Sequence, residues 1–174
     1  MNANLAPALL DPGVLHSRPG TPLAPRGLCL HSTATPGADA RRIRAFFNGP
    51  PGRDASAHFA VDDLEILVLV PVSEMAWGAG PTSNRLHLHL ELCEFDDPAR
   101  FQAALGNWVW LAATLCLLFG WEVEDGATVC SHQQVSARWR ETDHTDPLPL
   151  LARHGLAWLD VVARIAAATG ATPL

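Results

Sequence analysis

The stretch 86–94, LHLHLELCE, places three side chains that can bind a metal or transfer a proton at alternate positions. In an extended strand alternate side chains share a face, so His87, His89 and Glu91 project together while the intervening leucines project to the other face. Imidazole and carboxylate groups at this spacing can hold a metal ion. The same face could equally line a cleft whose metal ligands lie elsewhere.

Two further histidines each end a short apolar run, GLCLH at His31 and TVCSH at His132. We expect both runs to be strands, and a sheet brings strand ends that are distant in sequence to one edge. A carboxylate from the later segment TDHTDP could complete a zinc site of two histidines and one carboxylate, with a fourth position left for water. Cys29 and Cys130 each precede one of these histidines by two residues, so a closed Cys₂His₂ structural site is an alternative.

The composition predicts one packed globular domain, since 48% of the 174 residues are hydrophobic and only 17% are charged. Eighteen acidic residues against twelve basic ones give a net charge of -6, which argues against nucleic-acid binding through the phosphate backbone. Four cysteines are too few for a secreted disulfide scaffold, so we expect reduced thiols.

The N-terminal residues show neither the basic start nor the uninterrupted apolar stretch of a signal peptide, so we expect cytoplasmic synthesis without Sec export. The apolar run 107–120 is too short and too interrupted to span a bilayer, and we expect no membrane insertion. Five prolines within residues 1–26 predict an extended arm over the surface of a domain formed by residues 27–174.

In the first half of the domain the pattern predicts a helix and a hairpin. Thr35 and Pro36 supply a helix start, and the helix carries an apolar stripe of Ile43, Phe46 and Phe47 before GPPG ends it. The runs 57–61 and 64–70 then read as two strands that turn at Asp62-Asp63.

In the second half, Asp97-Pro98 opens a long apolar helix that ends at Gly120. The strand 128–132 follows, then a polar loop over 133–149 and a final helix over 150–169. Helices that fall between strands indicate an α/β fold: a single domain with a central mixed β-sheet flanked by helices. The histidines at the strand ends would place the zinc site at one edge of the sheet.

Four segments occur together, in a defined order, over about residues 28–151. They are HSTATPGADARRIRAFFN, ASAHFAVDDLEILVLVPVSEMAWGAG, NRLHLHLELCE and SHQQVSARWRETDHTDP. In this order they resemble the zinc-dependent N-acetylmuramoyl-L-alanine amidases, the family that includes phage amidase endolysins and peptidoglycan recognition proteins.

The resemblance implies a Zn²⁺ ion held by His31, His132 and Asp146, the last of which directly precedes Pro147. It implies that Glu91 is the catalytic glutamate, which takes a proton from the attacking water and passes it to the departing amine. His144 then faces the oxyanion of the tetrahedral intermediate.

Several residues depart from the family's pattern or compete for these roles. Asp143 and His144 are alternatives for the third ligand. His87 and His89 take positions that the family usually gives to serine and glycine, so they are not inherited ligands and instead line the cleft or fill space below it. Gly78 stands where the family commonly has histidine, so a side-chain contact to the substrate would be absent. We expect His58 to be a structural histidine beneath the site.

The activity implied by the resemblance is endolysin-like or autolysin-like hydrolysis of the amide between N-acetylmuramic acid and the L-alanine of the stem peptide. We expect a monomer that acts on peptidoglycan or a soluble muropeptide after its release to the cell wall. One alternative is a non-catalytic module of the same fold that binds or senses peptidoglycan fragments. Another is an iron-dependent oxygenase that uses His87, His89 and a carboxylate.

Overall fold

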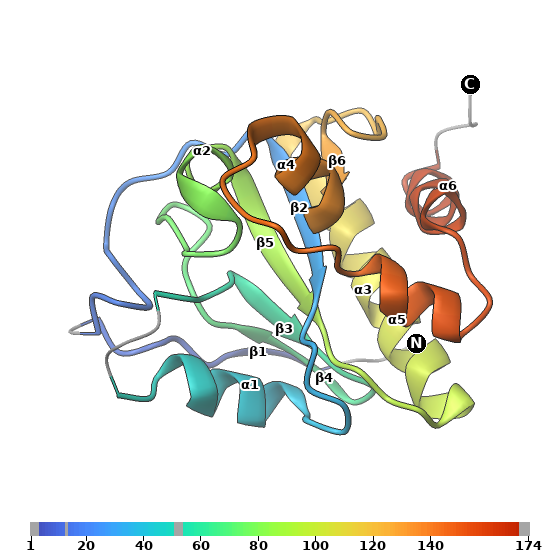
Figure 1. The fold of residues 1–174 in the computed structure, drawn as a ribbon, viewed down its shortest axis with the longest axis horizontal. Helices are drawn as coiled ribbons and strands as arrows, with labels where there is room; N and C mark the ends of the chain where they lie inside the picture. The colour runs from blue at the N-terminus through green and yellow to red at the C-terminus, as the bar shows by residue number, and fades with distance from the viewer. Residues whose placement is uncertain (1–3, 13, 51–53, 171–174) are drawn as a thin grey trace.

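The structure is a computed structural model that describes residues 4–12, 14–50 and 54–170. It contains a six-stranded mixed sheet with helices on both faces, which confirms the predicted α/β class (Figure 1). The strands are β1 (Asn4–Pro7), β2 (Gly27–Ser32), β3 (Phe59–Val61), β4 (Glu65–Val68), β5 (His87–Leu92) and β6 (Val129–Ser131). The helices are α1 (Ala40–Phe47), α2 (Gly80–Asn84), α3 (Pro98–Phe119), α4 (His132–Trp139), α5 (Leu148–Arg153) and α6 (Trp158–Ala168).

The strand order is β1-β4-β3-β5-β2-β6, in which β3 and β4 are antiparallel and the other paired strands are parallel. The predicted hairpin is therefore confirmed as β3 and β4. Because β3, β5, β2 and β6 run in the same direction, their carboxyl ends meet at one edge of the sheet.

The register between β2 and β5 separates an apolar face from a polar one. Leu28 pairs with Leu88 and Leu30 with Leu90, whereas Cys29 pairs with His89 and His31 with Glu91. Side chains alternate along each strand, so the leucines share one face and the chemically active residues share the other. The prediction that His87, His89 and Glu91 share one face of the strand is thus confirmed.

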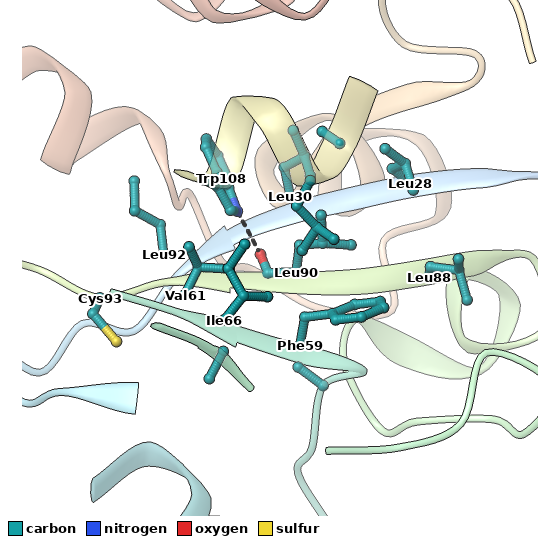
Figure 2. Packing of buried hydrophobic residues seen from close by; sticks show 14 of the residues in the cluster. Leu28, Leu30, Phe59, Val61, Ile66, Leu88, Leu90, Leu92, Cys93 and Trp108 are labelled. Carbon is teal, nitrogen blue, oxygen red and sulfur yellow. Dashed lines mark hydrogen bonds between the residues drawn. The ribbon is translucent and has the colours of Figure 1, made fainter. Parts of the chain in front are cut away.

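Helix α3 covers the apolar face. Its predicted bounds are confirmed: Asp97 caps the first turn, and Gly120 ends the helix with φ of 68°. Trp108 is fully buried above the leucines of β2 and β5, and its Nε1 donates to the Leu90 carbonyl at 3.2 Å (Figure 2). By length and composition α3 could cross a membrane, but 61% of its most apolar window is buried inside the domain, as expected of a core helix.

The predicted start of α1 is wrong by several residues. Asp39, not Thr35, is the N-cap, and its carboxylate accepts from the Arg42 amide at 2.9 Å. The Thr35 hydroxyl instead donates to the Thr33 carbonyl. Gly37, which lies between Thr35 and Asp39, adopts φ of 79° and turns the chain before the helix begins.

The predicted polar loop over 133–149 is also wrong, because α4 occupies its first half. Ser131 and Gln134 form a capping box, a local signal that starts a helix directly after β6. The predicted final helix is in fact two helices, α5 and α6. The chain turns between them at Gly155, where φ is 69°.

The N-terminal segment is more than a surface arm. Its strand β1 pairs in parallel with β4 and forms one edge of the sheet. Leu10 and Leu23 are buried in the core, and the Arg44 side chain of α1 donates to the Ala8 and Leu9 carbonyls. Pro7 is tolerated because an edge strand has one side without ladder hydrogen bonds.

Candidate metal centre and cleft

Three candidate ligands meet at the carboxyl edge of the sheet. His31 lies near the end of β2, His132 follows β6 as the first residue of α4, and Asp146 lies between α4 and α5. One possible ligand atom from each lies within 4.8 Å of the others. Nδ1 of His31 is 3.1 Å from Oδ2 of Asp146, and Nδ1 of His132 is 3.1 Å from Oδ1. Parallel pairing of β2 with β6 brings the two histidines together, although 101 positions separate them in the sequence.

One atom in this cluster indicates that a metal ion fits. The Nδ1 atom of His132 is buried and, despite its distance to Asp146, makes no hydrogen bond. A buried nitrogen without a partner is costly unless something binds its lone pair. Two imidazole nitrogens and one carboxylate oxygen are a donor set that suits Zn²⁺ and leaves a fourth position open.

The electrostatics of the cluster favour the forms that bind metals. Burial lowers the pKa of His31, so its ring stays neutral. Burial alone would raise the pKa of Asp146, but the neighbouring rings of His132 and His31 outweigh burial and hold the pKa well below its ordinary range. A neutral imidazole and an ionised carboxylate are the states in which these residues coordinate a cation.

The second nitrogen of each histidine ring is also held in place. Nε2 of His31 lies 3.0 Å from Nδ1 of His89, and Nε2 of His132 lies 3.0 Å from the hydroxyl oxygen of Thr142. The Thr142 hydroxyl is in turn 2.6 Å from that of Ser136 on α4. Such contacts fix the orientation of metal-binding rings. Sequence analysis missed both Thr142 and the contact of His89.

A cleft of about 280 Å³ opens beside the three candidate ligands. Ile43, Phe46 and Phe47 of α1 form an apolar wall, as the predicted stripe of that helix would allow. Trp77 also lines the cleft.

The predicted catalytic residues both line this cleft. Glu91 has a buried Oε2 atom without a hydrogen-bond partner. Burial above all, with the nearby charges of Asp146 and Glu94, raises the pKa of Glu91 to about 8. His144 is 64% exposed at the rim, with its ring stacked on that of His132 at 4.7 Å and its Nδ1 3.6 Å from Asp146 Oδ1, too far for a hydrogen bond.

The competing candidates for metal binding are less well placed. Asp143 is exposed, and neither it nor His144 belongs to a metal-binding cluster of the described residues. Cys130 and His87 likewise belong to none, so the Cys₂His₂ site and the His87-His89-Glu91 site are not assembled in this part of the chain.

A second cluster, Cys29, His31 and His89, shares one histidine with the first. Burial raises the pKa of the Cys29 thiol well above its ordinary value, which keeps the sulfur protonated and a poor ligand. His58 is fully buried beside this cluster and hydrogen-bonds the Glu74 carbonyl and the His89 amide, in agreement with its expected structural part.

Comparison with known proteins identifies the family. Residues 20–149 match the N-acetylmuramoyl-L-alanine amidase family. The chain is 38% identical over 105 residues to the N-acetylmuramoyl-L-alanine amidase CwlH of Bacillus subtilis, a match that covers 57% of this chain and 41% of CwlH. It is 35% identical over 120 residues to a probable N-acetylmuramoyl-L-alanine amidase of Bacillus licheniformis, which covers 60% of this chain and 34% of that protein. The chain thus spans less than half the length of these relatives.

Solved structures agree with this result. The catalytic domain of XlyA, an amidase of Bacillus subtilis, superposes with a TM-score of 0.77 at 29% identity, covering 94% of this chain and 99% of that domain. The hydrolase AmiA of Staphylococcus aureus shares the fold with a TM-score of 0.85 at 22% identity, over 97% of this chain and 85% of that one. With most of its length matched, the chain belongs to the N-acetylmuramoyl-L-alanine amidase family.

Proposed function

We propose that this protein is a zinc-dependent N-acetylmuramoyl-L-alanine amidase that cleaves peptidoglycan in the manner of an endolysin or autolysin. The observation that carries the proposal is the convergence of His31, His132 and Asp146 within 4.8 Å beside an open cleft that also contains Glu91. Membership in the family supports the same reaction. Water is added across the amide, which leaves a carboxylate on the lactyl group of N-acetylmuramic acid and a free amine on L-alanine.

In this proposal His31, His132 and Asp146 hold Zn²⁺. When bound, the ion supplies Lewis-acid chemistry: it polarises a carbonyl and makes water acidic enough to lose a proton near neutral pH. The buried Nδ1 of His132 and the ionised Asp146 are the strongest support for this ligand set.

Glu91 is proposed as the proton-transfer residue. A carboxyl whose pKa is raised to about 8 by burial is suited to both parts of the reaction, since it can accept the proton of the attacking water and return it to the leaving amine. His144, at the cleft rim, donates a hydrogen bond to the oxygen of the scissile carbonyl as negative charge develops on it.

We further propose that the substrate is peptidoglycan or a muropeptide derived from it. The protein would be made in the cytoplasm, act on the cell wall after release, and work as a monomer. Sedimentation of the purified protein tests the last point, and fractionation of producing cells before and after lysis tests the route to the wall.

Digestion of purified peptidoglycan tests the reaction. The zinc-loaded protein should release stem peptides that begin with free L-alanine and should create no new reducing sugar ends. Glu91→Gln should keep zinc but lose activity by about 10²-fold to 10⁴-fold. Asp146→Ala should lose zinc, while Asp143→Ala, an exposed neighbour on the same segment, should bind it normally.

Each result separates one part of the proposal from the rest. Peptide release by fully chelated protein would refute zinc dependence. Zinc binding by Asp146→Ala at the wild-type affinity would move the third ligand elsewhere. Binding of peptidoglycan fragments without any release would instead indicate the non-catalytic binding module.

A further inference from the structure

His89 lies on the polar face of β5 and contacts a candidate zinc ligand, but the proposed mechanism gives it no part. Its side chain is fully buried, and its Nδ1 lies 3.0 Å from Nε2 of His31. On the opposite side of the same ring, Nδ1 of His31 faces Asp146 and the proposed metal position. His89 therefore touches the ring nitrogen that the metal does not use.

A neutral imidazole carries one proton, so its two nitrogens cannot both be acceptors. If Nδ1 of His31 gives its lone pair to a cation, its proton must be on Nε2, and that N–H needs an acceptor because it is buried. Nδ1 of His89 is the atom within hydrogen-bond distance. His89 can accept this bond only with its own proton on Nε2, a buried atom that makes no hydrogen bond within the described residues. The arrangement therefore leaves one buried N–H of His89 unpaired.

The strand and its neighbours hold His89 in this position. The backbone N–H of His89 donates to Nδ1 of His58 at 2.9 Å, and Nε2 of His58 reaches the Glu74 carbonyl at 2.9 Å. The rings of His58 and His89 are stacked, with centroids 5.8 Å apart and planes 18° from parallel. A buried strand and a buried stacking partner leave the ring of His89 few alternative rotamers.

Gly78 provides the space for that ring. A methyl group on Gly78 would lie only 2.3 Å from both Cγ and Nδ1 of His89. The turn cannot easily yield, because the side-chain oxygen of Asn84 accepts from the amides of Gly78 and Ala79 at 2.9 Å each. The backbone of Gly78 and the ring of His89 are thus packed against each other.

We propose that His89 is a positioning residue: its Nδ1 accepts the Nε2 proton of His31 and so presents the Nδ1 lone pair of His31 to the metal, and position 78 is glycine because this ring needs the room. The proposal rests on the proposed function, since it assumes that His31 binds zinc. It assigns His89 no contact with the substrate.

Zinc affinity, measured by competition with a chromogenic chelator, tests the proposal without an activity assay. His89→Ala should bind Zn²⁺ about 10-fold to 100-fold more weakly than the wild type. His89→Asn should recover most of the affinity, because its Oδ1 stands where Nδ1 of histidine stands and can accept the same proton. The matched control is His87→Ala: His87 is a buried histidine on the same face of β5 that lies 2.9 Å from the Ser83 hydroxyl, and its loss should leave affinity unchanged.

Gly78→Ala should weaken zinc binding in the wild type but have no further effect in the His89→Ala background, a coupling that a double-mutant cycle measures. If His89→Ala does not fold, Gly78→Ala and His89→Asn still decide the matter. Wild-type affinity in His89→Ala, or equal losses in His89→Asn and His89→Ala, would overturn the positioning role while the proposed function stands. Two zinc ions per chain would assign His89 to a second metal site instead. A wild type that binds no zinc would overturn both proposals.

Discussion

Protonation of His58 should make the stability of the metal-free protein depend on pH. His58 is fully buried, its Nδ1 accepts from the His89 amide, and its Nε2 donates to the Glu74 carbonyl. A second proton on Nδ1 would point at the His89 N–H and break that bond. Burial accordingly lowers the pKa of His58 from 6.5 to about 4.

The sign of the effect follows from proton binding. Between the folded pKa of about 4 and the unfolded value of about 6.5, the unfolded chain holds more protons than the folded one, so stability falls as the pH falls. From about pH 7 to about pH 5, this single group should remove about 2 kcal/mol of unfolding free energy. The contribution is fully present only above the unfolded pKa.

Denaturant unfolding of the metal-free wild type and of His58→Asn at both pH values measures this contribution. The variant loses part of the hydrogen bonding at either pH, so that cost cancels when each protein is compared with itself. The wild type should lose about 2 kcal/mol more than His58→Asn on acidification. His16→Asn, which alters a partly buried histidine of the N-terminal segment, is the control. Parallel pH profiles for wild type and His58→Asn would refute the reasoning.

Three further outcomes can be measured by unfolding. Zinc at about 1,000 times its Kd should add about 4 kcal/mol to the wild type, and neither zinc nor chelator should change Asp146→Ala. Trp108→Phe should cost about 2 to 3 kcal/mol, with an unchanged denaturant slope, because it leaves a small void and removes the indole hydrogen bond to the Leu90 carbonyl. Glu94→Ala should cost about 2 kcal/mol and Glu94→Gln less, because the buried carboxylate accepts from the Ser32 hydroxyl, the Ala34 amide and Arg153.

Features with a local cause could be predicted from the sequence. The alternation in 86–92 determines which side chains share a face of β5, whatever lies next to the strand. Asp97-Pro98 and Gly120 are start and stop signals that act within one turn of helix, and the bounds of α3 follow them. Strand ends at His31 and His132 could be inferred in the same way.

Features that depend on tertiary contacts were missed or misplaced. Prolines suggested a surface arm, but pairing with β4 and burial of Leu10 decide where the N-terminal segment lies. The polar composition of 133–139 suggested a loop, whereas the capping box at Ser131 and packing of Val135 against the polar side of the sheet favour a helix. A helix can be mostly polar when a single buried stripe holds it to the domain.

The contact between Gly78 and His89 shows a different limit. From the sequence, Gly78 suggested an absent side-chain contact to the substrate, and His89 suggested a residue that lines the cleft or fills space below it. Only the structure shows that a methyl group on Gly78 would lie 2.3 Å from the ring of His89. The packed interior has no spare volume for both the His89 ring and a side chain at position 78. Gly78 and His89 are therefore best interpreted together, as two parts of one packing arrangement.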